Sequence, residues 1–235
     1  MGVQLDTLTL DNQKAYRLIN SKLPTIELFE DVSSAEDFKD LYELQALTNP
    51  RLTAEKFGRM DYLNVDEAPW GITGASYAIA PFTHVSPGGS RFSNGEYGML
   101  YLAESMDTAI AEVAYHQSRY LANVENLAFD RLVFRGLACT FSGQAIHDAT
   151  VLSQEHDIYS PDNYSDAQTL GNQIRSDGSE GIQYWSVRDP GKTCWGLFTP
   201  KGVQSIVQTV HLEFVIDGKN IIDICQVTTC KKDPI

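Results

Sequence analysis

The chain lacks the cysteine pairs and the long apolar runs on which several classes of protein depend. Its four cysteines are scattered and form no C-x-x-C pair, so neither a metal site nor a redox motif built on cysteine is expected. Reduced thiols of this kind fit the cytoplasm. No apolar stretch approaches the roughly 18 residues that a membrane span requires, and no apolar segment opens the chain. The sequence therefore predicts a cytoplasmic protein with no membrane association.

Positive charge is also scarce. The chain has 18 Lys and Arg against 31 Asp and Glu, a net charge of −13. Because nucleic acids are bound by an excess of basic residues, direct nucleic-acid binding is not expected, although a local basic pocket for a dinucleotide is compatible with this balance. The metal motif H-E-x-x-H and the dinucleotide fingerprint G-x-G-x-x-G are both absent. We therefore expect no catalytic metal, and any dinucleotide must bind without a Rossmann turn.

The N-terminal third is predicted to be helical. Residues 34–48 carry apolar side chains at helical spacing after a serine N-cap, and a second helix is predicted from Thr53. Residues 66–89 contain three prolines and several glycines, which favours irregular chain. These signals divide the chain into an N-terminal helical appendage, residues 1–79, and a catalytic domain, residues 80–235.

The rest of the chain mixes strands with helices without a regular β-α-β alternation, which favours an α+β fold. Strands are predicted at residues 99–103, 132–141 and 194–198, helices after Ser105 and at residues 165–176, and a hairpin at residues 203–227 with Asp217-Gly218 as its turn.

The segment from Gly88 to His116 contains the best candidates for catalysis. Arg91 lies in a glycine-rich loop, Tyr101 in a short apolar strand, and Glu112 in the helix that follows. Arginine supplies a fork of donors for phosphate, and tyrosine supplies a flat apolar face with a polar tip. A glutamate supplies negative charge for a developing cation. The three residue types suit an anionic, aromatic substrate whose reaction builds positive charge.

This pattern, together with the downstream segment GIQYWSVRDPG at residues 181–191, resembles the RES domain, a family named for an arginine, a glutamate and a serine. By this resemblance Arg91, Glu112 and Ser186 are the naming residues, and the similarity covers residues 80–215. Members are toxins of bacterial toxin–antitoxin pairs that degrade NAD, and their fold is related to ADP-ribosyltransferases. The resemblance thus implies an ADP-ribosyltransferase-like mixed β core and an antitoxin partner with a helix-turn-helix of the Xre type.

The implied reaction breaks the bond between ribose and nicotinamide through an oxocarbenium-like state. Glu112 would stabilise that cation, Tyr101 would flank the nicotinamide ribose, and Arg91 would bind phosphate. Ser186 has no His–Asp partner at useful spacing, so a hydrogen bond to the ligand is expected rather than nucleophilic attack. Arg188 could add a second phosphate contact unless the adjacent Asp189 neutralises it.

Three functions remain open from the sequence. The favoured one is an enzyme that uses NAD as substrate, with no other cofactor, and transfers ADP-ribose to water or inorganic phosphate. The second transfers ADP-ribose to a cellular protein, and the third is a non-catalytic partner-binding domain. The oligomeric state is also open. One departure from longer family members is the segment PFTH at residues 81–84, where an arginine is expected after the phenylalanine.

Overall fold

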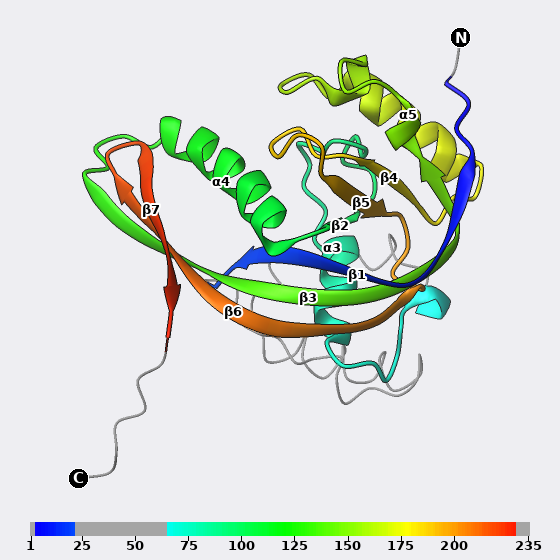
Figure 1. The fold of residues 1–235 in the computed structure, drawn as a ribbon, viewed down its shortest axis with the longest axis horizontal. Coiled ribbons are helices and arrows are strands. Elements are labelled where there is room, and N and C mark those ends of the chain that lie inside the picture. The colour runs from blue at the N-terminus through cyan, green and yellow to red at the C-terminus, as the bar shows by residue number, and fades with distance from the viewer. Residues whose placement is uncertain (1–2, 22–64, 229–235) are drawn as a thin grey trace.

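The computed structural model describes residues 3–21 and 65–228, which form an α+β protein built on one mixed sheet (Figure 1). The strands are β1 (Thr7–Asn20), β2 (Leu100–Ala103), β3 (Phe129–Asp148), β4 (Gly181–Trp185), β5 (Thr193–Leu197), β6 (Val203–Asp217) and β7 (Asn220–Val227). The helices are α3 (Ala75–Thr83), α4 (Met106–Ala122) and α5 (Ser165–Ser176). The predicted α+β class is confirmed.

The long strand β3 organises the sheet, because it pairs with β1, β4 and β6. The strand order is β1-β2-β5-β4-β3-β6-β7, and the additional pairing of β1 with β3 closes the first five strands into a ring. The pairing between β1 and β2 is the shortest in this ring, because it consists of one residue pair, Tyr16 and Ala103. Beyond that pair the two strands are not hydrogen-bonded to each other, and the candidate site described below lies there.

The assignment of the whole N-terminal segment to a helical appendage is wrong for residues 7–20, which are β1. An antiparallel ladder with β3 from Thr7 to Asn20 supplies their backbone hydrogen-bond partners. Such long-range pairing leaves no local signal in the sequence. The helices predicted at residues 34–48 and from Thr53 lie outside the described residues, whereas the boundary predicted at residue 79 falls inside α3 (Ala75–Thr83).

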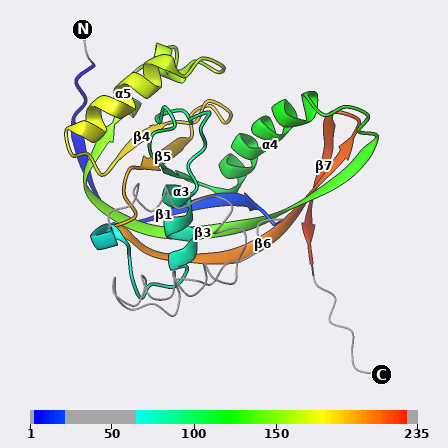
Figure 2. The ribbon, with the colours of Figure 1, turned by 180° about the vertical axis from the view of Figure 1, so that it is seen from behind.

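The core has two parts, one on each side of β2. Leu100 and Leu102 pack with α3, whereas Tyr101 and Ala103 belong to the part that α4 and α5 cover. Figures 1 and 2 show α4 and α5 on the same side of the long strands. Successive strand residues face opposite sides, so this alternation turns Tyr101 towards α4.

Helix α3 was not expected, since residues 66–89 were predicted to be irregular. Its buried residues Ala75, Ala78, Ile79 and Phe82 follow helical spacing, and their packing against the sheet outweighs the proline at position 81. The helix starts without a side-chain cap at Gly74, whose φ is 80°. A Cβ at Gly74 would lie 2.0 Å from the Ile206 carbonyl oxygen, so close contact with β6 requires glycine here.

The remaining predicted elements are found with small changes of boundary, except that the strand predicted at residues 132–141 extends over Phe129–Asp148 as β3. Ser105 caps α4 by accepting a hydrogen bond from the Thr108 amide, and Gly218 has a φ of 59° in the turn between β6 and β7. None of the described helices is both long enough and apolar enough to span a membrane.

Candidate active site

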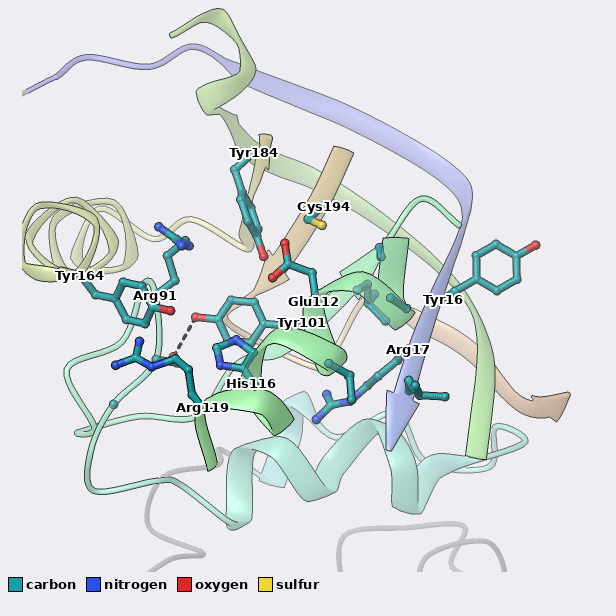
Figure 3. A pocket seen from close by; sticks show the side chains of 17 residues that line it. Tyr16, Arg17, Arg91, Tyr101, Glu112, His116, Arg119, Tyr164, Tyr184 and Cys194 are labelled. Atoms are coloured by element: carbon teal, nitrogen blue, oxygen red, sulfur yellow. Dashed lines mark hydrogen bonds between the residues drawn. The ribbon is translucent and has the colours of Figure 1, made fainter. Parts of the chain in front are cut away.

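A cavity of about 430 Å³ opens between β1, β2 and α4 (Figure 3). Three of the five predicted site residues, Arg91, Tyr101 and Glu112, line it, and they come from the loop, strand and helix that the sequence indicated. Ser186 and Arg188 are not among its lining residues. The structure thus brings together the central predicted set and places the other two predicted residues outside the cavity wall.

Glu112 is the only carboxylate among the described residues that line the cavity. The Ser186 hydroxyl donates a hydrogen bond of 2.6 Å to Glu112 Oε1. Ser186 Oγ in turn accepts hydrogen bonds from the backbone amides of Arg188 and Asp189, at 3.2 and 3.0 Å. Because those two amides already donate to Ser186, its own proton is directed to Glu112. Ser186 therefore contacts the candidate catalytic carboxylate instead of facing the cavity itself.

The Tyr101 side chain lines the cavity, and its hydroxyl group forms hydrogen bonds with the glycine-rich loop. The hydroxyl oxygen accepts a hydrogen bond of 3.0 Å from the Phe92 amide and lies 2.8 Å from Ser90 Oγ. Burial raises the pKa of Tyr101 to about 12, so the phenol stays neutral at physiological pH. In this arrangement Tyr101 supplies an apolar face and fixes the loop, and it is not poised to exchange a proton.

The glycine-rich loop is also held from α5, because the Gln168 amide donates to the carbonyl oxygens of Ser90 and Ser93 at 3.0 and 3.2 Å. Gly89 has a φ of 72°, and a Cβ there would lie 2.5 Å from the Ser93 carbonyl oxygen. The tight loop that carries Arg91 thus requires glycine at this position.

Arg91 already uses part of its guanidinium group. Its Nη1 donates to the carbonyl oxygens of Ile158 and Ser160 at 2.9 and 3.0 Å, and the group lies 4.6 Å from the centroid of the Tyr164 ring. An arginine has five N–H donors, so these two bonds leave the edge formed by Nε and Nη2 for a ligand. That edge retains the geometry for a bidentate contact with phosphate.

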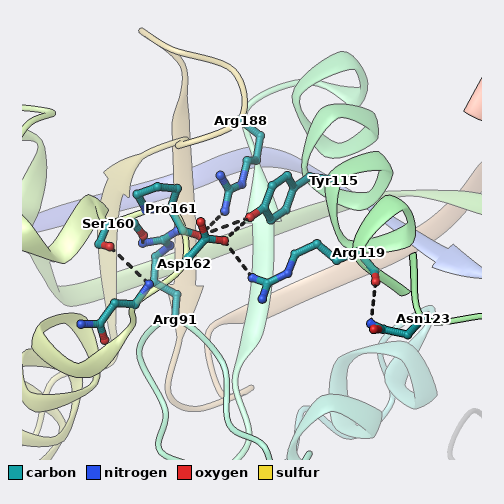
Figure 4. A network of polar contacts seen from close by, with 9 residues as sticks. Arg91, Tyr115, Arg119, Asn123, Ser160, Pro161, Asp162 and Arg188 are labelled. Atoms are coloured by element: carbon teal, nitrogen blue, oxygen red, sulfur yellow. Dashed lines mark hydrogen bonds and ion pairs between the residues drawn. The ribbon is translucent and has the colours of Figure 1, made fainter. Parts of the chain in front are cut away.

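The residues that follow Ile158 are held by further arginines at the edge of the site (Figure 4). Arg119 pairs with Asp162 at 3.1 Å, and the Tyr115 hydroxyl donates to the same carboxylate at 2.6 Å. Arg188 donates to the Pro161 carbonyl oxygen, and its guanidinium carbon lies 3.3 Å from the centroid of the Tyr115 ring. The hydrogen bond from Tyr115, followed by the nearby arginines, lowers the pKa of Asp162. Arg188 therefore supports this segment in the structure.

Arg17 is a site residue that the sequence analysis missed. It extends from β1 into the cavity and also lines a second, adjoining cavity of about 160 Å³ (Figure 3). Burial lowers its pKa to about 10, so it remains a cation at neutral pH. Its buried Nη1 has no hydrogen-bond partner, in contrast to the Nη1 groups of Arg91 and Arg119. The available signal was a single charged residue within the otherwise apolar run AYRLI at residues 15–19.

His116 and Cys194 are two further titratable groups in the cavity wall that the sequence analysis did not select. Burial, together with Arg188, Arg119 and Arg91, lowers the pKa of His116, while Glu112 acts in the opposite direction. Burial raises the pKa of Cys194 to about 12, so this residue is a thiol and a poor nucleophile at neutral pH. Among the described residues no group of three or more His, Cys, Asp or Glu is arranged to hold a metal ion.

Comparison with known proteins agrees with the resemblance drawn from the motif. The model of the RES domain family matches residues 68–217, which is more than half of the chain. A Sinorhizobium fredii (strain NBRC 101917 / NGR234) protein, "Uncharacterized protein y4oC", is 28% identical over 207 residues, covering 88% of this chain and 84% of its own. The crystal structure of the M. tuberculosis MbcT–MbcA toxin–antitoxin complex contains a chain with 12% identity and a TM-score of 0.41, covering 87% of this chain and 86% of that one. A TM-score this low supports no conclusion about this chain.

Proposed function

Since this chain belongs to the RES domain family, we propose that it is an enzyme that degrades NAD by cleaving the bond between nicotinamide and ribose. The observation that carries the proposal is the position of Glu112. It is the only carboxylate among the described lining residues, it is held by Ser186, and it shares its cavity with the cation Arg17. The fixed carboxylate can stabilise positive charge that develops at the reacting ribose, and the cation can bind the phosphates of the same substrate.

In the proposed reaction Glu112 stabilises the oxocarbenium-like ribose as the bond to nicotinamide breaks. Nicotinamide leaves as a neutral base from a ring that is already cationic, so no acid is needed to protonate it. The Tyr101 ring provides a flat surface beside the nicotinamide ribose. The free edge of Arg91 and the unpaired Nη1 of Arg17 are the donors available for the pyrophosphate.

Arg91→Lys tests the binding part of this proposal. Lysine keeps the positive charge but lacks the planar guanidinium group. In the wild type that group donates to the Ile158 and Ser160 carbonyl oxygens with one nitrogen and has a second edge free for phosphate. We expect the KM for NAD to rise about tenfold while kcat changes less, measured by the initial rate of nicotinamide release. An unchanged KM would remove Arg91 from the binding site and assign it to support of the loop alone.

The acceptor of ADP-ribose is proposed to be inorganic phosphate. Three cations, Arg17, Arg91 and Arg119, line the described wall, and Arg17 and Arg91 have donors to spare, so the pyrophosphate of NAD need not occupy both of these two. With purified protein and NAD at constant ionic strength, the rate should rise and saturate with added phosphate. Mass spectrometry should then identify ADP-ribose phosphorylated at the anomeric position.

The same assay separates the other acceptors. A phosphate-independent rate that yields free ADP-ribose would make the protein a glycohydrolase. Label from NAD on an added cellular protein fraction would make it an ADP-ribosyltransferase. Absence of nicotinamide in every condition would leave the non-catalytic alternative.

The proposed biological role is that of a toxin in a bacterial toxin–antitoxin pair. An enzyme that consumes NAD in its own cytoplasm needs restraint, and RES family toxins are paired with helix-turn-helix antitoxins of the Xre type. We propose such a protein as the partner of this chain, bound so that it narrows or blocks the cavity that contains Glu112. The net charge of −13 favours a partner surface that is basic.

A further inference from the structure

The turn of residues 186–193 contacts α4 at Thr108 and Glu112, which are four residues apart, and contacts Glu104, which precedes the N-cap of the helix. The three contacts join Glu104 to Lys192 and Thr193, Thr108 to Asp189, and Glu112 to Ser186. Residues four apart lie on one face of a helix, one above the other. The turn therefore runs along one face of α4 and reaches Glu112 at its far end.

The middle contact is made entirely of buried or partly buried polar atoms. Thr108 is fully buried, and its hydroxyl lies 2.8 Å from Asp189 Oδ2. A carboxylate can only accept, so Thr108 donates its one hydroxyl proton to Asp189. Ser105 Oγ, 2.9 Å away, then donates to Thr108 Oγ1 while accepting from the Thr108 amide. Each hydroxyl in this series of hydrogen bonds thus has one defined acceptor, and these bonds hold the Thr108 side chain in one rotamer.

Asp189 is connected to Glu112 by two routes. Its side chain holds Thr108, which precedes Glu112 by one helical turn, and its backbone amide donates to Ser186 Oγ, which donates to Glu112. Its negative charge also lies beside the N-terminal turn of α4, where a helix stabilises anions. The sequence left open whether Asp189 neutralises the neighbouring Arg188, but the Asp189 carboxylate contacts Thr108. Arg188 bonds the Pro161 carbonyl and stacks on Tyr115.

We propose that Thr108 and Asp189 are positioning residues that hold Glu112 in place for cleavage of NAD. This inference rests on the proposed function. Neither residue lines the cavity, so both act through the position of the Glu112 carboxylate. Much of the rate of an enzyme depends on correct placement of its catalytic groups, and a displacement of about 1 Å can reduce that rate about 10²-fold.

The test compares Thr108→Val, which keeps the shape of the side chain and removes the hydroxyl, with Thr108→Ser, which keeps the hydroxyl. For Thr108→Val we expect kcat for nicotinamide release to fall about tenfold or more while the KM for NAD stays within about threefold. Thr108→Ser should stay within about threefold of wild type on both constants. Calorimetric titration with ADP-ribose should give wild-type stoichiometry for both variants, which shows that the fall in kcat is not a loss of folded protein.

A crystal structure of Thr108→Val provides a measurement that does not depend on activity. We expect the contact between Ser186 Oγ and Glu112 to be broken or lengthened. An intact contact, a wild-type kcat, or a fall in kcat matched by the loss of ADP-ribose binding sites would each overturn the positioning role. Failure of the wild-type protein to release nicotinamide would instead overturn the proposed function, and the crystal structure would still decide whether Thr108 positions Glu112.

Discussion

The Glu112→Gln variant is expected to release nicotinamide from NAD at least about 10²- to 10³-fold more slowly than wild type. Glutamine preserves the size of the side chain and can still accept the hydrogen bond from Ser186, which is 2.6 Å in the wild-type protein. What is lost is the negative charge that faces the developing cation. Because no other carboxylate lines the cavity among the described residues, no neighbour can substitute for it.

The matched control is Glu125→Gln, which removes the same charge from an exposed position after α4. This variant should keep wild-type kcat and KM. Thermal unfolding should give similar midpoints for both variants and the wild type, since neither change creates a cavity. If Glu112→Gln kept more than about a third of wild-type turnover, Glu112 would not be the group that stabilises the transition state.

Arg17→Met is expected to raise the KM for NAD about 10- to 100-fold. A hydrogen bond to a charged group contributes about 1.5–3 kcal/mol, and each 1.4 kcal/mol is a factor of ten in affinity. Methionine fills a similar volume without the charge. The thermal midpoint should stay the same or rise, because the wild-type protein buries an arginine whose Nη1 has no partner.

A loss of affinity without a loss of stability would mark Arg17 as a binding residue. Arg131→Met is a suitable control, because Arg131 is an exposed residue of β3 that pairs with Glu213. Its removal should change neither KM nor the thermal midpoint appreciably, since exposed ion pairs contribute little. A wild-type KM in Arg17→Met, or a large fall in its thermal midpoint, would show that Arg17 has a structural role only.

The parts of the fold that local sequence signals specify were predicted well. The serine cap of α4 and the alternation in β2 each depend on neighbouring residues and are found where the sequence indicated, and the hairpin turn predicted at Asp217-Gly218 lies one residue later, at residues 218–219. Strand β1 was missed, because its structure depends on pairing with β3, which lies more than a hundred residues away in the chain. Helix α3 was missed because burial of one face outweighs its proline.

The same distinction holds for the site. Arg91, Tyr101 and Glu112 lie within 22 residues of one another and were found as a motif. Arg17 reaches the cavity only through the β1–β3 ladder, so no spacing in the sequence connects it to Glu112. The contact of Ser186 with Glu112 and that of Asp189 with Thr108 join segments 74 and 81 residues apart. The sequence suggested a ligand contact for Ser186, whereas its geometry shows a contact with the carboxylate.

The most direct test of the central claim is to incubate the purified wild-type protein with NAD and phosphate and to follow free nicotinamide by mass. We expect one nicotinamide for each NAD consumed, with the ADP-ribose unit intact in the co-product and no release by Glu112→Gln. NAD that remains intact, or that is cleaved at its pyrophosphate to give nicotinamide mononucleotide, would contradict cleavage of the bond between nicotinamide and ribose by this protein.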